Sequence, residues 1–115
     1  MSLPLRTIEP DMSWRPVVEA TALEFIPGAR VVRYLGRINI HLIKESNTVR
    51  EGGGLGAFFL SFLHQAHAVA KAHVEGLGGN ALLSYRVVRR ETGGQKNQAY
   101  NLVSLTGDAA LVRYV

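Results

Sequence analysis

The stretch EGLGGNALLSYRVV, residues 75–88, contains the change from helix to strand on which the fold depends. Apolar residues recur at helical spacing before Gly78, and after Asn80 they form a run that is typical of a buried strand. A glycine of positive φ can close a helix at this point, so we expect one at Gly78 or Gly79. We also expect the Asn80 side chain to bond nearby backbone. Bound phosphate is not expected here, because anions bind at helix N-termini.

A helix from Leu55 to Leu77 accounts for the sequence before this corner. One wide stripe is apolar, as expected of a helix that packs on a sheet. The opposite side is also apolar at several positions, which suggests contact with something other than water. The glycine-rich stretch GGGLG, residues 52–56, precedes the helix and is a weak anion candidate, since it lacks the spacing of known phosphate-binding loops. The apolar residues on the helix back, which are candidates for an oligomer interface, are Phe58, Leu60, Ala68 and Ala72.

The chain before the helix is predicted to form an arm, a turn and a strand. Residues 1–16 hold three of the four prolines and are predicted to form an extended arm or linker, which leaves residues 17–115 as the domain. Pro27-Gly28 suits the central positions of a type II turn. Residues 31–45 then alternate as a strand, and Gly36 interrupts the alternation, so we expect a bulge there.

The chain after the helix is predicted to hold two more strands, at residues 81–88 and 100–105, joined by a glycine-containing loop over residues 89–99. The pattern is then broken around Gly107, by either a tight turn or a bulge, and we favour the bulge. The order is β-α-β-β with extra short strands at both ends. It predicts an α+β domain with one helix across an antiparallel sheet.

Composition excludes several classes of function. The chain has 115 residues, no cysteine and a net charge of +4, so thiolate metal sites and cysteine nucleophiles are ruled out. A cytoplasmic location fits best. Nucleic-acid binding is not expected, because the arginines are scattered; even in the densest group, alternation places Arg86 and Arg90 on one face and Arg89 on the other.

The polar residues form no convincing catalytic set, and we predict no enzyme and no cofactor. His64 and His67 lie at i and i+3 on the helix, so they are weak candidates for a metal ion such as zinc. His73 falls within the apolar stripe, where a ring nitrogen could bond nearby backbone. Asp108 is expected to cap a turn rather than to catalyse.

Four segments, in order along the chain, resemble the YbjQ-like family, which is labelled as heavy-metal-binding. They are FIPGARVVRYLGRINIHLIKES, REGGG, AHVEGLGGNALLSY and KNQAYNLVSLTGDAALV, within about residues 18–114. Within that family the resemblance is closest to the C-terminal domains of animal C2-domain-containing proteins. The residues that correspond to the family's turns, kinks and bulges are positions at which the backbone geometry is special. They are Ile26 to Gly28, Tyr34 to Gly36, Leu77 to Ala81, and Gly107 with Ala109.

The resemblance implies a dodecin-like subunit that assembles into a homopentamer or a multiple of it. It further implies a non-enzymatic oligomerisation module of a larger protein in calcium-dependent vesicle traffic. Calcium and the membrane, at the vesicle or the plasma membrane, would then be bound by a C2 domain outside these residues. The alternative is a metal- or small-ligand-binding protein, as the family label suggests, although no ligand motif of that family can be placed here.

Overall fold

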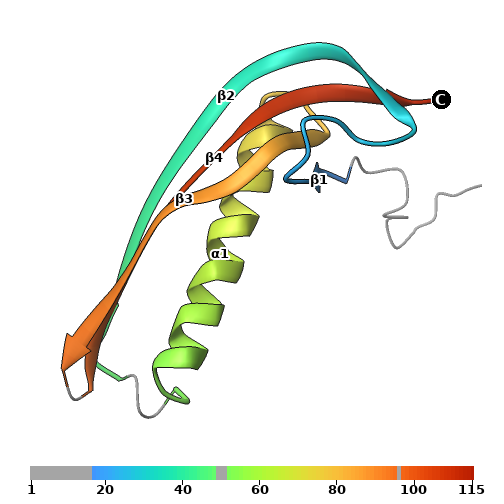
Figure 1. Cartoon of the computed structure of the whole chain (residues 1–115). Coiled ribbons are helices and arrows are strands. Elements are labelled where there is room, and N and C mark those ends of the chain that lie inside the picture. Colours follow the sequence, from blue (N-terminus) through green and yellow to red (C-terminus); the bar gives the residue numbers. More distant parts are fainter. Residues whose placement is uncertain (1–16, 49–51, 96) are drawn as a thin grey trace, which may run out of the picture.

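A computed structural model of the chain describes residues 17–48, 52–95 and 97–115, so the predicted arm of residues 1–16 lies outside the described residues. The fold is α+β, as predicted: one helix lies across one face of a four-stranded sheet (Figure 1). The helix α1 spans Leu55–Gly76, one residue shorter than predicted. The strands are β1 (Glu19–Ala20), β2 (Ala29–Ser46), β3 (Ala81–Gln95) and β4 (Gln98–Tyr114).

The sheet has the order β1-β3-β4-β2 and is mixed rather than purely antiparallel. β2 and β3 both run antiparallel to the central strand β4, whereas β1 runs parallel to β3. The antiparallel sheet predicted from the β-α-β-β order is confirmed for β2, β3 and β4, and the additional short strand β1 joins it in parallel. The reason is local: the segment around β1 lies alongside the helix exit, where Glu19 N donates to Asn80 O and Thr21 N to Leu82 O, both at 3.0 Å.

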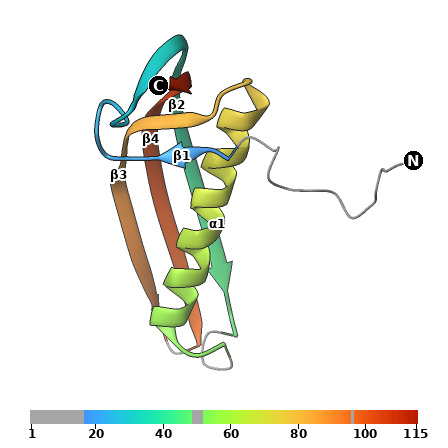
Figure 2. The ribbon, with the colours of Figure 1, turned by 90° about the vertical axis from the view of Figure 1, so that its right-hand side faces the viewer.

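The main core lies between α1 and one face of the sheet, whereas the other face carries no helix (Figure 2). The predicted alternation in β2 is confirmed, because Ile38 and Ile40 are buried and Leu42 is half-buried against this core. A second, smaller cluster includes Ile26, from the β1–β2 connection, and Val112. The helix contributes Phe62, Ala66, Ala70 and Val74 to the main core.

The predicted loop over residues 89–99 is wrong, because β3 and β4 form one long hairpin through this region. Antiparallel pairing continues as far as Gln95 opposite Gln98. The glycines that suggested a loop have another explanation. A Cβ at Gly93 would lie 2.6 Å from the ring of Tyr100, so Gly93 leaves room for a cross-strand aromatic side chain.

The helix exit closes as a Schellman motif. Gly78 has a φ of 87°, which confirms the predicted positive φ. Gly78 N donates to Glu75 O and Gly79 N to Val74 O, both at 3.0 Å, so two terminal carbonyls of the helix are satisfied. Gly79 is required for a different reason: a Cβ there would lie 2.8 Å from Leu35 Cδ1 and 2.9 Å from Ala110 O.

The predicted turn before β2 is also present. Gly28 has a φ of 82°, and Ala29 N donates to Ile26 O at 3.0 Å, as a β-turn centred on Pro27-Gly28 requires.

Four register shifts bend the sheet, and every extra residue lies on β2 or β3. The predicted bulge at Gly36 is confirmed, because the β2–β4 register shifts between Tyr34 and Gly36. The bulge predicted around Gly107 lies instead on the neighbouring strand, since the β3–β4 register shifts between Leu83 and Arg86. A Cβ at Gly107 would lie 2.6 Å from Leu82 Cδ1, so this glycine permits close packing beneath the bulged strand.

Candidate functional site

Both long edges of the sheet are open along most of their length. β2 is the last strand on one side, and no described strand pairs with its outer edge. On the other side β1 pairs with Ala81 and Leu82 of β3, and the segment after β1 accepts hydrogen bonds from Ser84 N and Tyr85 N. The rest of β3, from Arg86 to Gln95, has no strand beside it among the described residues. We call these two open edges together with the outward side of α1 the assembly surface.

Large apolar side chains are exposed along this surface. The most exposed apolar side chain of β2 is Ile43, at 62%, and that of β3 is Val88, at 51%. On α1, Leu60 is 59% exposed and Val69 is 43% exposed. Large apolar side chains that are exposed to water gain free energy when a partner covers them. The other exposed apolar side chains of β2 and β3 are Val31, Val32, Tyr34 and Val87.

The structure places the predicted interface residues of the helix back as follows. Leu60, Ala68 and Ala72 are exposed, whereas Phe58 is half-buried near the start of the helix. Phe59, its neighbour, lies beneath the Arg90 guanidinium, whose carbon is 5.2 Å from the ring centroid. This cation–π contact fixes the N-terminal half of α1 to β3.

The prediction that Arg86 and Arg90 share a face is wrong. The β3–β4 register shifts between Val87 and Arg89, so the extra residue inverts the alternation. Arg86 is opposite Thr106 and Arg89 opposite Ser104, on the face without the helix, whereas Arg90 points toward α1. A single bulge therefore gathers two arginines that strict alternation would separate.

The helix-free face of the sheet carries a polar network that sequence reasoning missed. Arg37 Nε and Nη2 donate to the two carboxylate oxygens of Asp108 at 3.1 and 3.3 Å, and Tyr34 Oη donates to Oδ1 at 3.1 Å. The expected turn cap at Asp108 is wrong, because Asp108 lies within β4. Two pairs further along the same face, His41 Nδ1 and Ser104 Oγ are 2.7 Å apart. The polar alternation of Arg37, Asn39 and His41 was the available signal.

The helix histidines do not form a metal centre with a third ligand. Among the described residues no group of three histidine or carboxylate side chains could hold a metal ion. His64 is exposed, and His67 is half-buried and hydrogen-bonded through Nδ1 to Tyr85 Oη. The prediction for His73 is wrong: it is exposed near the helix end rather than at the edge of the core.

His67 and Tyr85 connect the helix to the bulged part of β3. Their rings meet edge to face, with centroids 5.4 Å apart. Burial, with smaller contributions from Lys71 and His64, lowers the pKa of His67, and burial raises the pKa of Tyr85 to about 12. At neutral pH both groups are therefore uncharged, which suits a contact at the margin of the core.

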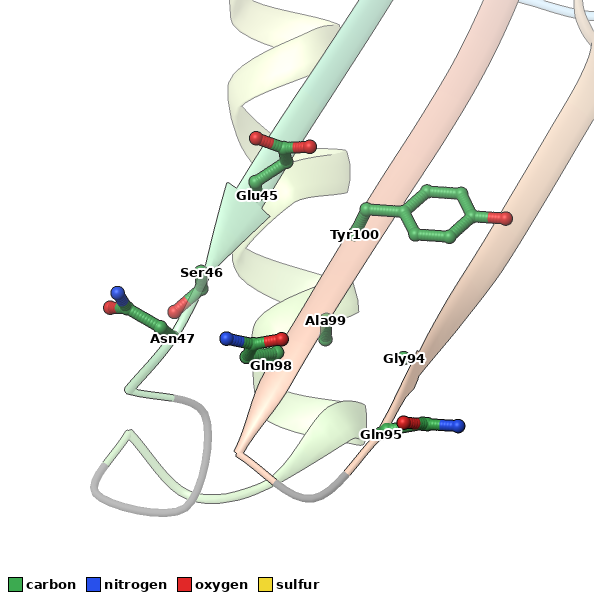
Figure 3. A pocket seen from close by; sticks show the side chains of 8 residues that line it. All are labelled: Glu45, Ser46, Asn47, Gly94, Gln95, Gln98, Ala99 and Tyr100. Carbon is green, nitrogen blue, oxygen red and sulfur yellow. The ribbon is translucent and has the colours of Figure 1, made fainter.

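A cavity of about 600 Å³ lies on the sheet near the tip of the β3–β4 hairpin (Figure 3). It is an open trough, and among the described residues that line it Glu45 alone is charged. Its described lining residues include no paired nucleophile and base, so they form a shallow polar surface. Its lining residues are Glu45, Ser46, Asn47, Gly94, Gln95, Gln98, Ala99 and Tyr100.

Two further features bear on binding. The helix N-terminus at Gly54 has no side-chain cap and no acidic residue in the first turn, so the weak anion candidate at residues 52–56 stays a prediction. Within the described ranges, no helix combines the length and the hydropathy needed to cross a bilayer.

Comparison with known sequences gives consistent matches. The family model of the C2CD5 C-terminal domain matches residues 20–112. Over 98 residues, 83% of this chain, the chain is 44% identical to C2 domain-containing protein 5 of Homo sapiens and of Mus musculus. The identity to the Xenopus tropicalis protein is 43%. Each alignment covers 10% of the relative, so the chain spans about a tenth of the length of the curated relatives it matches.

Comparison with solved structures supports the fold. The crystal structure of a protein of unknown function from Pediococcus pentosaceus, of the DUF74 (YbjQ-like) family, matches with a TM-score of 0.59. The match covers 84% of this chain and 98% of that chain at 12% identity, so it bears on the fold alone. The YbjQ-like fold expected from the sequence is confirmed.

Proposed function

This chain belongs to the family of the C2CD5 C-terminal domain, and from that premise we propose that it is a non-enzymatic homo-oligomerisation module. The observation that carries the proposal is the pair of open strand edges, β2 on one side and most of β3 on the other. Unpaired N–H and C=O groups along a strand edge are a template for pairing with another chain. Two such edges on one subunit allow every copy to bind two neighbours.

The direction of the strands favours a closed ring. β2 and β3 are both antiparallel to β4, so they run in the same direction as each other. A rotation about an axis roughly along the strands would place β2 of one copy beside β3 of the next, as a parallel pair. Head-to-tail contacts of this kind either close into a ring or extend into a fibre, and closure leaves no edge open. We propose five subunits, or a multiple of five, as the YbjQ-like resemblance implies.

The helix back gives the ring a second contact. Leu60 and Val69 are exposed on opposite flanks of α1, about 180° apart at 100° per residue, and Ala68 and Ala72 are exposed on the back of the helix between these flanks. Burying a fully exposed leucine contributes on the order of 2 kcal/mol. Repeated around a ring, this contribution would favour an obligate assembly over a folded monomer.

In the longer protein the module would act by multiplying other domains. The matched relatives are named for a C2 domain, and we propose that a C2 domain elsewhere in such a protein binds calcium and membrane lipid. Five weak membrane contacts joined on one ring act together through their effective concentration. The module itself would lie in the cytoplasm and would reach vesicles or the plasma membrane through that domain.

A charge placed on the helix back tests the proposal. Leu60→Glu should dissociate the assembly, because a carboxylate would lose its hydration at the interface. Gln98→Glu, at the exposed hairpin tip, adds the same charge away from the open edges and the helix back and should leave the assembly intact. Sedimentation velocity of the two variants measures the difference. If Leu60→Glu sediments like the parent, the helix back is not part of the interface.

A further inference from the structure

Three arginines share one face at the end of the sheet that extends beyond α1 (Figure 1). Arg30 of β2 lies directly opposite Arg113 of β4. Val112, the neighbour of Arg113, points into the small cluster with Ile26, so Arg113 and Arg30 point to the other face. All three arginines are exposed, the third being Arg33.

A bulge is responsible for the position of Arg33. Arg33 is three positions after Arg30, so regular alternation would place them on opposite faces of β2. The β2–β4 register instead shifts between Val31 and Arg33, which places Arg33 opposite Leu111. Leu111 and Arg113 are two residues apart on β4, which has no bulge, so all three guanidinium groups lie on one face. Two residues along a strand span about 7 Å.

No acidic side chain among the described residues forms an ion pair with this cluster. The two ion pairs within those residues are Arg37 with Asp108 and Arg89 with Glu91. Like charges directly opposite each other on neighbouring strands destabilise a sheet, and Cβ atoms at such positions are about 5 Å apart. The Arg30–Arg113 pair is therefore unfavourable in the isolated chain, and a bound anion would remove the repulsion.

We propose that Arg30, Arg33 and Arg113 bind a ligand that carries two or more neighbouring phosphate groups. Guanidinium groups bind phosphate oxygens through two parallel hydrogen bonds. Three of them within this area match the charge density of clustered phosphates, whereas isolated carboxylates each carry a single charge. The same headgroup chemistry occurs in soluble inositol phosphates and in phosphoinositide lipids. Arg30 and Arg33 lie on β2, whose outer edge belongs to the assembly surface, whereas Arg113 lies on the central strand β4.

Titration calorimetry with inositol hexakisphosphate tests the site on the full chain. The variant Arg30→Gln with Arg113→Gln should bind at least about tenfold more weakly, as expected for the loss of two charge-assisted contacts. The matched control is Lys71→Gln with Arg86→Gln, which removes the same charge from two exposed side chains elsewhere. It should bind within about twofold of the parent. Circular dichroism should be the same for all three proteins.

The outcomes separate the ligand sources. Flotation with phosphatidylcholine vesicles that contain phosphatidylinositol bisphosphate, compared with phosphatidylserine vesicles of equal charge, identifies a lipid source. Binding of the hexakisphosphate alone identifies a soluble source, and both results support the site. An equal loss in both double variants, equal affinity for polyglutamate of the same charge, or no binding to either phosphate probe would overturn it.

Discussion

The Asn80 side chain pairs with the backbone of Val112 through two hydrogen bonds. Asn80 Nδ2 donates to Val112 O at 3.1 Å, and Val112 N donates to Asn80 Oδ1 at 2.8 Å. The backbone N of Asn80 also donates to Ala110 O at 3.1 Å. The amide group therefore extends the β3–β4 ladder by one pair and joins the helix exit to the last strand.

Replacing Asn80 with alanine should destabilise the fold. The substitution leaves the backbone N and O of Val112 without partners, at a cost of about 1–3 kcal/mol. Asn80→Asp should recover part of this loss, since a carboxylate still accepts from Val112 N but cannot donate to Val112 O. Urea unfolding at one fixed protein concentration measures both. Asn47→Ala, at an exposed position, is the control, and equal stability of Asn80→Ala and the parent would contradict this role.

Gly78 and Gly79 should respond differently to substitution. Gly78→Ala should cost about 1 kcal/mol because its φ is positive, and Gly78→Asn should cost less, since asparagine tolerates that conformation. At Gly79 any side chain meets Leu35 and the carbonyl of Ala110, so Gly79→Ala and Gly79→Asn should both cost more. The measure is the thermal unfolding midpoint of the four variants. Equal tolerance of asparagine at both positions would show that the two glycines do not have separate roles.

The stability of the fold should decrease in mildly acidic solution because of His67. Burial lowers the pKa of His67 in the folded chain, so the unfolded chain takes up the proton first as the pH falls. The contribution of neutral His67 to the free energy of unfolding is complete above the pKa of histidine in the unfolded chain, about 6.5. It is lost progressively below that pH, down to the pKa of His67 in the folded chain. Chemical denaturation between pH 8 and pH 5 should show this loss in the parent.

Two variants separate the His67 contribution from other titrations. His67→Gln should flatten the pH dependence, whereas His73→Gln, which removes an exposed histidine from the same helix, should retain it. If the stability of the parent and that of His67→Gln fall with the same slope as the pH is lowered, another titrating group causes the effect.

The sequence predicted the parts of the fold that depend on local chemistry. The helical stripe, the positive φ at Gly78, the turn at Pro27-Gly28 and the bulge at Gly36 each follow from a residue's own conformational preference. The structure agrees with all four. The exposed apolar side of α1, including Leu60, was visible in the same way, because surplus apolar residues do not fit a single buried stripe.

The errors arose where a neighbouring strand decides the outcome. Gly93 suggested a loop, but its partner Tyr100 makes a glycine necessary within the strand. The bulge at Val88 shifts the faces of the residues that follow it, so Arg89 lies on the same face as Arg86, where alternation could not place it. Extra residues of this kind depend on pairing register, which a single sequence does not specify.

The most direct test of the account is the mass of the assembly in solution. Size-exclusion chromatography with multi-angle light scattering should give about five times the 12.6 kDa chain mass, or a multiple of that value. The open edges of β2 and β3 require a partner at each end, so the mass should persist on dilution. A folded, monodisperse species at the mass of one chain would contradict the ring.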